Sequence, residues 1–439
     1  MNPCLGPLLA TLVLSAGSAS PAAPPPASDP PNFLVLVWDD VGWEDIFEAQ
    51  TPLLDIGAQF SRKYVQARAC PTCTPSRVGF HFGRLPSRDK VSGVDLGSAS
   101  DPGVPPSIES LADSMKAGGY STGMFGKWHV SNEVELAPAP IVEAARIHGY
   151  DVWRAGRVAN VTAQFPPGPW SHYNWPRIDD GVETLSTQYA SEAVMQSWSA
   201  WWDATPGPKY AHVSVYAPHT PYDPPPSYLL PPGYPTPQTQ RDFYLADIAG
   251  LDRMLAEVAI HVDLSNTYVF LVSDNGTPGG VSSPNTVWNG HKGTPWEGGV
   301  RIPFYVWGPG VLPGFDSDLV QVSDIPATVC ELAGLPVSPD AIDSISFSGT
   351  LSGGVGSRTY SMCHYFTSLS SGHGVADRWC VVRDDGMKLV HDSGLVSLYD
   401  LSIDYSEKFP LNFGYATNAM AALDLFAYAQ SVLGPNWPN

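Results

Sequence analysis

The segment FLVLVWDD, residues 33–40, places two acids close behind five consecutive apolar residues. A short apolar run without alternation is typical of a β-strand buried on both faces, as the central strands of parallel sheets are. Ligands in open α/β sheets bind at the carboxyl ends of strands, so we expect Asp39 and Asp40 at a binding edge. Two adjacent carboxylates would repel each other there unless a cation held them together. A turn formed by Asp40 before Gly42 is the simpler alternative for this pair taken alone.

Strand-like and helix-like segments alternate along most of the chain. Further strands are expected at residues 122–125, 210–216 and 267–272. Helices are expected from a cap at Ser107 to Gly118, and at residues 184–204 and 244–258. Strands that alternate with helices indicate an α/β fold, with a large mixed, mostly parallel sheet sandwiched by helices.

The pattern changes after Asp343. Short strand-like pieces occupy residues 379–383, 387–391 and 396–400, and an amphipathic helix is expected at 418–433. We interpret residues 32–343 as a catalytic domain and residues 344–439 as a small α+β subdomain with a short antiparallel sheet and a terminal helix.

The N-terminus is typical of an exported protein. Residues 1–20 combine an apolar run from Leu5 to Ala16 with small residues behind it, which indicates a signal peptide, and residues 21–31 form a Pro/Ala-rich spacer. The apolar run is too short to span a bilayer, so we expect a periplasmic or secreted protein without stable membrane insertion. The formal net charge of −20 argues against nucleic acid as a partner.

A second pair of oxygen ligands follows another strand. Asp274 and Asn275 stand just past the strand that ends at Val272. Carboxylate and amide oxygens at two strand ends are what Ca²⁺ or Mg²⁺ prefers, whereas zinc would favour His or Cys. The two pairs therefore predict a hard-cation site.

The motif CTPSR at residues 73–77, followed by Gly83 and Arg84, is the most specific signal in the chain. Pro75 fits the start of a helix, and a helix N-terminus favours an oxyanion. The motif resembles that of the sulfatases of the alkaline phosphatase superfamily. Other motifs resemble the same family in the same order: GKWH at 126–129, APHTP at 217–221, SDNG at 273–276, GHKG at 290–293, EGGVRIP at 297–303, and LYDL at 398–401.

The resemblance implies a mechanism and a set of residues. A formylglycine-generating maturation enzyme would oxidise Cys73, and the product would attack sulfur, forming a covalent sulfo-enzyme and releasing an alcohol and then inorganic sulfate. The cation, Ca²⁺ rather than Mg²⁺, would be held by Asp39, Asp40, Cys73, Asp274 and Asn275.

The remaining polar groups of these motifs receive roles by the same resemblance. Lys127 and His129 are two residues apart in an extended segment and project to one side, with Trp128 opposite. Lys127 and Lys292 would bind sulfate oxygens, and Arg77 would fix the oxygens of the nucleophile. His219 would contact the substrate and protonate the leaving alcohol, and His129 would act as a base when sulfate is expelled.

Several questions stay open at the level of sequence. The substrate is expected to be a sulfated polysaccharide or glycan, since aromatic residues such as Trp153, Trp170 and Trp175 could stack on sugar rings. An aryl or alkyl sulfatase, a phosphonate or phosphate monoester hydrolase, and a catalytically silent carbohydrate-binding relative are the alternatives. Cys363 and Cys380 could form a disulfide, or they and the other cysteines besides Cys73 could be buried thiols.

Overall fold

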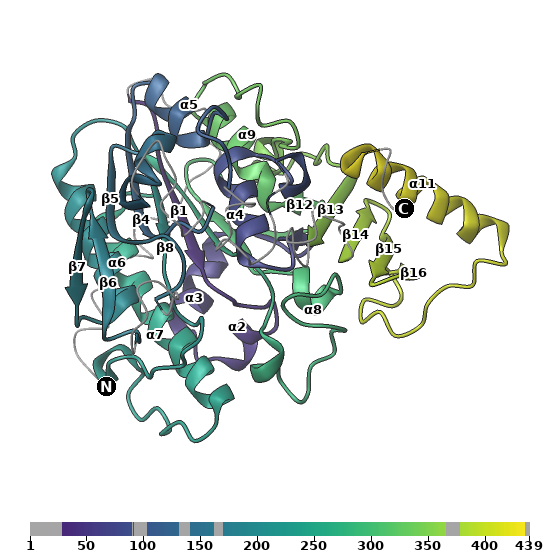
Figure 1. Ribbon diagram of the computed structural model, residues 1–439, viewed down its shortest axis with the longest axis horizontal. Coiled ribbons are helices and arrows are strands. Elements are labelled where there is room, and N and C mark those ends of the chain that lie inside the picture. The colour runs from purple at the N-terminus through teal and green to yellow at the C-terminus, as the bar shows by residue number, and fades with distance from the viewer. Residues whose placement is uncertain are drawn as a thin grey trace.

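A computed structural model describes residues 29–89, 91, 103–130, 141–161, 170–365 and 378–434 of the chain. The predicted signal peptide and most of the spacer lie outside these residues. Within them, a ten-stranded mixed sheet has the order β11-β2-β10-β9-β1-β8-β4-β5-β6-β7 (Figure 1). Its strands are β1 (Asn32–Trp38), β2 (Arg62–Tyr64), β4 (Ser121–Lys127), β5 (Val152–Arg157), β6 (Trp175–Asp179), β7 (Val182–Ser186), β8 (Lys209–Ser214), β9 (Thr267–Ser273), β10 (Phe304–Trp307) and β11 (Gly314–Asp316).

The apolar run at residues 33–37 forms the centre of this sheet. β1 lies between β8 and β9 and is parallel to both, while β10, β6 and β7 pair antiparallel with their neighbours. The prediction of a mixed, mostly parallel sheet is therefore confirmed, with the parallel strands in the middle.

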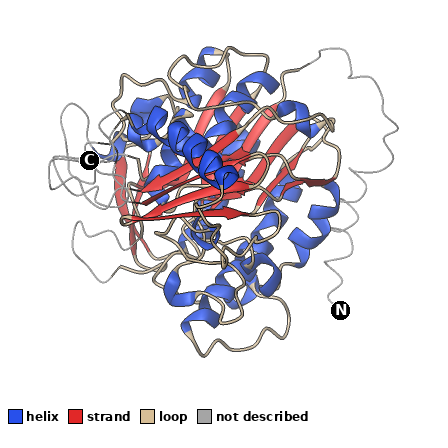
Figure 2. Ribbon diagram, turned by 90° about the vertical axis from the view of Figure 1, so that its right-hand side faces the viewer, coloured by secondary structure: helices blue, strands red, loops and turns tan. Residues whose placement is uncertain are grey.

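Helices cover both faces of the sheet (Figure 2). Phe33, Val35 and Val37 pack in one core cluster with α4 (Cys73–Phe82), α5 (Leu111–Ala117) and α9 (Ile325–Leu332). Leu34, Leu36 and Trp38 pack in a second cluster with α3 (Pro52–Gly57), α6 (Ala190–Ala204) and α7 (Gln240–His261). Because successive side chains of a strand point to opposite faces, one continuous apolar run supplies both cores. Each side chain buried in this way contributes about 1.5–3 kcal/mol relative to exposure.

A separate small sheet follows toward the C-terminus. β13 (Tyr360–Tyr365), β14 (Arg378–Arg383), β15 (Met387–Asp392) and β16 (Leu395–Asp400) pair antiparallel in sequence order. α11 (Ala416–Leu433) packs Leu425 and Ala429 against Trp379 and Leu389 of this sheet. Shorter elements are β3 (Ala67–Arg68), which pairs with β12 (Val320–Gln321), and the helices α2 (Asp45–Glu48), α8 (Glu297–Val300) and α10 (Ser348–Leu351). The expected α+β architecture is present, while the domain boundaries themselves stay predictions.

Two helices begin later along the chain than expected. The helix expected from residue 184 begins at Ala190, because residues 184–186 belong to β7, which pairs with β6 and carries β-branched Val182 and Thr184. The helix expected from Ser107 starts instead at Leu111, because Ser110 and Asp113 form a capping box with two reciprocal hydrogen bonds of 3.0 Å. Gly118 ends this helix as expected.

Two further expectations concerned a disulfide between Cys363 and Cys380 and membrane insertion of the chain. Cys363 and Cys380 are opposite each other across β13 and β14, and both are buried free thiols, as are Cys70 and Cys330. No helix of the described chain has the length and apolarity needed to cross a bilayer.

The cap of α5 yields a test of the corrected boundary. Replacing Ser110 by Ala removes the acceptor for the Asp113 amide, so we expect the free energy of unfolding to fall by about 1 kcal/mol. The matched variant Ser107→Ala, at an exposed position outside the helix, should change it by less than about 0.5 kcal/mol. Urea denaturation of both variants measures this difference, and equal effects would contradict the assignment of the cap.

Candidate active site

The ends of β1 and β9 bring the two predicted acidic pairs together. Trp38 and Ser273 are neighbours in the parallel register, so the residues that follow them meet at one edge. The amide of Asp40 donates to Asp274 Oδ1 over 3.1 Å, and Asn275 Nδ2 donates to Asp40 Oδ1 over 2.8 Å. All four residues of the two pairs are buried.

Cys73 is the first residue of α4 and points into this acidic cluster. Its Sγ lies 3.8 Å from Asp39 Oδ1 and 3.9 Å from Asp40 Oδ1. Together with His219, these three residues offer ligand atoms that all lie within 4.8 Å of one another. Burial raises the pKa of the Cys73 thiol to about 12, so an unmodified thiol at this position would be un-ionised at neutral pH.

The donor set fits a hard divalent cation. Burial, and then repulsion from Asp274, raise the pKa of Asp39 to about 7 despite the opposing charge of Lys127, as expected of a carboxylate whose neighbouring cations do not fully compensate its burial. Asn275 Oδ1 is buried and accepts no hydrogen bond from the described residues, which leaves an amide oxygen available as a ligand. Carboxylate and amide oxygens of this kind are the ligands of Ca²⁺ and Mg²⁺.

Arg77, one turn along α4 from Cys73, holds the carboxylates of the cluster. Its Nη2 lies 2.7 Å from Asp274 Oδ2 and 3.7 Å from Asp39 Oδ2. Its Nη1 donates to Ser214 Oγ over 2.5 Å and to the Lys127 carbonyl over 3.0 Å. Burial raises the pKa of Asp274, but the Arg77 guanidinium, together with the Lys127 and Lys292 cations, outweighs this effect and keeps that pKa below its usual value. Among the described residues, its hydrogen bonds go to Asp274, Ser214 and the Lys127 carbonyl, while its expected role in fixing the oxygens of the nucleophile stays a prediction.

The GKWH segment projects its side chains alternately at the end of β4. Lys127 Nζ lies 2.6 Å from Asp39 Oδ2, while Trp128 turns to the other side and packs against His81 and His148. His129 is buried, and its Nδ1 has no hydrogen-bond partner among the described residues. Burial, reinforced by the nearby Lys127 and Arg77 cations, holds the pKa of His129 well below its usual value, so the imidazole is neutral.

Lys292 and His219 approach Asp40 from two further loops. Lys292 Nζ lies 2.5 Å from Asp40 Oδ1, and His219 Nε2 lies 3.8 Å from Asp40 Oδ2. His219 Nδ1 is 2.8 Å from the Thr220 carbonyl, so this nitrogen carries the hydrogen and Nε2 faces the cluster with its lone pair. Burial, and then the Lys292 charge, lower the pKa of His219 to about 3. The Asp40 carboxylate acts in the opposite direction, but its effect on the pKa is smaller.

Close packing between the SDNG and EGGVRIP motifs requires glycine at two positions. A Cβ on Gly276 would lie 2.0 Å from the Gly298 carbonyl oxygen, and one on Gly299 would lie 2.2 Å from the Thr294 carbonyl oxygen. Neither position accepts a larger residue unless the backbone moves, which ties the SDNG and EGG motifs to each other.

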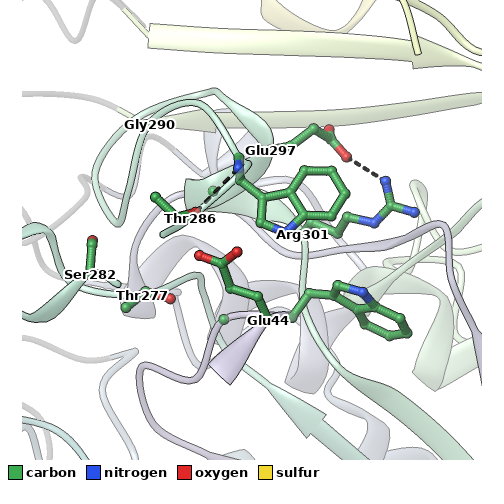
Figure 3. A pocket seen from close by; sticks show the side chains of 11 residues that line it. Glu44, Thr277, Ser282, Thr286, Gly290, Glu297 and Arg301 are labelled. Carbon is green, nitrogen blue, oxygen red and sulfur yellow. Dashed lines mark hydrogen bonds and ion pairs between the residues drawn. The ribbon is translucent and has the colours of Figure 1, made fainter. Parts of the chain in front are cut away.

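Sequence reasoning did not identify the side chains that hold the backbone next to the acidic cluster in place. Asp45 Oδ2 accepts hydrogen bonds from the Gly42 amide, the Tyr244 hydroxyl and the Thr277 hydroxyl, at 2.8, 2.5 and 2.6 Å. The Tyr244 hydroxyl also lies 2.8 Å from the Asp40 carbonyl. Thr277 and Glu44 line a small pocket beside these groups, with Gly290 and Glu297 opposite (Figure 3). His172 is also buried, with Nε2 3.0 Å from the His219 carbonyl.

A family model described as sulfatase matches residues 31–335, more than half of the chain. The chain belongs to the sulfatase family. Dog N-acetylgalactosamine-6-sulfatase is 29% identical over 393 residues, covering 78% of this chain and 69% of the relative. Rat arylsulfatase G is 27% identical over 380 residues, covering 74% of this chain and 69% of that protein.

The solved structures agree with this assignment at the level of the fold. The structure of Ps i-CgsB in complex with k-i-k-neocarrahexaose has a TM-score of 0.74 at 20% identity and covers 92% of each chain. The expected family, the alkaline-phosphatase-like fold and the class of sulfuric ester hydrolase are confirmed for this sulfatase. The roles of its individual residues stay predictions.

The contacts of Arg77 yield a stability prediction for the sulfatase. Arg77→Met leaves Asp274 buried without its partner, so we expect the free energy of unfolding to fall by about 3–5 kcal/mol. Arg383→Met on β14, which breaks ion pairs with the partly exposed Asp385 and Asp424, should cost less than about 1 kcal/mol. Chemical denaturation of the two variants compares these values. A loss at Arg77 no larger than that at Arg383 would show that the guanidinium is not the main counter-charge of the cluster.

Proposed function

We propose that this sulfatase hydrolyses a sulfate ester of a sulfated polysaccharide or glycan to an alcohol and inorganic sulfate. The observation that carries this proposal is the position of Cys73, at the start of a helix and within 4 Å of both Asp39 and Asp40. The dog relative is named for an N-acetylgalactosamine sulfate, and Ps i-CgsB was solved with a neocarrahexaose, which supports a carbohydrate substrate.

The charge of the site suits an anionic ester despite the acidic chain. Among the described residues, three cations (Arg77, Lys127 and Lys292) stand beside three acids (Asp39, Asp40 and Asp274). A divalent cation on the acids would leave the cluster with a net positive charge. The site could then attract a sulfate ester against the overall charge of −20.

Asp39, Asp40, Asp274 and Asn275, together with the group at position 73, would hold Ca²⁺, which would stabilise negative charge on the sulfate oxygens. Formylglycine made from Cys73 would supply a hydrated aldehyde, whose second hydroxyl is the feature that a serine lacks. This proposal includes export of the protein and a formylglycine-generating maturation enzyme as a partner.

The side chains of this protein would do the remaining work. Lys127 and Lys292 would exchange their contacts with the acids for the oxygens of the sulfate group. His219 would pass a proton from Nε2 to the leaving oxygen, and the anionic substrate would favour its protonation first. His129, neutral and with Nδ1 free of partners in the described chain, would accept a proton when sulfate departs. Arg77 would keep Asp274 and Asp39 in place throughout.

The nucleophile is tested by mass spectrometry of the Cys73 peptide. Protein made together with a formylglycine-generating enzyme should carry an aldehyde at position 73 and should hydrolyse members of a panel of sulfated glycans. Cys73→Ala should lose at least a thousandfold of this rate, since its methyl group provides no nucleophile.

Other outcomes of the same panel separate the alternatives. Faster turnover of aryl sulfates, or of phosphate or phosphonate esters, would reassign the substrate class. An unmodified thiol, in a preparation whose maturation enzyme converts a control sulfatase, would overturn the proposed nucleophile. Glycan binding without any turnover would favour a silent carbohydrate-binding relative.

The metal is tested without measuring activity. The melting temperature of chelator-treated protein should rise when Ca²⁺ is added, because only the folded chain assembles the site, by an amount that corresponds to about 2.7 kcal/mol at a hundredfold excess over Kd. Asp40→Asn should abolish this rise. Asp45→Asn, which alters a buried aspartate bonded to protein groups only, should keep it even if the melting temperature itself falls. An undiminished rise in Asp40→Asn would contradict the assigned ligands.

A further inference from the structure

The loop that carries Lys292 has little conformational preference of its own. We define the Lys292 loop as residues 289–297, between the strand-end acids and β10. Gly290 and Gly293 flank the lysine and adopt φ angles of +75° and +85°, which glycine reaches without strain. Because glycine is also the most flexible residue in an unrestrained chain, the position of Lys292 depends on contacts made by the rest of the loop.

Two backbone hydrogen bonds connect the loop to the segments that carry the second metal pair and Cys73. The Lys292 amide donates to the Thr277 carbonyl over 2.8 Å, close to the second metal pair. The Gly293 amide donates to the Pro71 carbonyl over 2.7 Å, two residues before Cys73. Both contacts use amides, so the carbonyl group of Gly293 is free to be held from the other side.

That other side is the C-terminal sheet. Arg378 on β14 donates from Nη1 to the Gly293 carbonyl over 2.8 Å, and its Nε lies 3.1 Å from Asp392 on β15. The same aspartate accepts a hydrogen bond of 3.2 Å from the indole of Trp296 in the loop. In Figure 1, α8 at the end of the loop lies between the large sheet and the small one.

The end of the loop is held by a buried group of charges centred on Glu297. Arg68 of β3 donates to both carboxylate oxygens of Glu297, at 3.0 and 2.9 Å, and Lys388 of β15 lies 2.7 Å away. Lys388 also lies 2.6 Å from Glu407, whose other oxygen accepts the Glu297 amide over 2.6 Å. Figure 3 shows Glu297 joined to Arg301 in the small pocket that Gly290, near the start of the same loop, also lines. The described part of the C-terminal region thus contacts the Lys292 loop at its middle and at its end.

We propose that the C-terminal sheet holds the Lys292 loop in its working position, with Arg378 as a positioning residue for the Lys292 ammonium. The inference rests on the proposed function, in which Lys292 binds the sulfate group. Arg378 contacts the backbone next to Lys292 and none of the proposed reacting groups, so the lysine is the nearest such group that it can position. Loss of the contact frees Gly293 and lets the ammonium move from its place near Asp40.

A double-mutant cycle tests this dependence. Arg378→Gln should lower kcat roughly tenfold on the best sulfate ester of the wild type, as small misplacements of catalytic groups do. It should also weaken binding of inorganic sulfate, the product, roughly fivefold by calorimetry. In a Lys292→Ala background the same substitution should change neither quantity, because the group that it positions is gone.

The control is Arg383→Gln, on the same strand but paired with Asp385 and Asp424 away from the loop, which should leave kcat and sulfate binding unchanged. Equal losses from Arg378→Gln in both backgrounds would mean a general structural effect and would overturn the inference, as would wild-type values in the single variant. If no sulfate ester is turned over, the proposed function fails, while the sulfate-binding cycle still decides the role of Arg378. A wild type that binds no sulfate overturns both.

Discussion

The burial of three carboxylates at the ends of two neighbouring strands is the constraint on which this site depends. Asp39, Asp40 and Asp274 are almost completely removed from water and close enough to repel one another. Charges buried in this way persist only when paired. The fold therefore directs a cation at each of them from a separate element, namely Arg77 from α4, Lys127 from β4 and Lys292 from a loop. These three cations lie in three separate motifs, CTPSR, GKWH and GHKG, which is why the motifs are spread along the chain.

Much of the fold and of the site could be predicted because its signals are local. Residues 33–37 are apolar without a break, which is typical of a strand covered on both faces, and the parallel register brings the two acids that follow to the end of β9. Lys127 and His129 share a side because an extended chain alternates. Such local patterns were enough to predict which edge of the sheet carries the site and which segments meet there.

What could not be predicted depends on partners distant in the chain. Residues 184–186 look helical until β6 is available to pair with them, and the start of α5 depends on reciprocal hydrogen bonds between Ser110 and Asp113 rather than on the earlier Ser107. The Arg77 guanidinium donates two hydrogen bonds to the carboxylate of Asp274, 197 residues away, and nothing in the CTPSR motif indicates this partner. Glu297 and Lys388 are 91 positions apart, and nothing in either segment indicates that they meet.

The enclosure of Cys73 has a consequence for the order of events in biosynthesis. Only 4% of this residue is accessible in the folded chain, since α4, both strand ends and the Lys292 loop surround it. An enzyme that oxidises a thiol must bring its own catalytic groups against the sulfur, and the finished fold leaves no room for them. Under the proposed function, activation would therefore have to precede folding, before residues 73–77 form the start of α4. A molecule that folded first would stay inactive until it unfolded again, so the yield of active protein would be set by a race between the maturation enzyme and the folding of the chain.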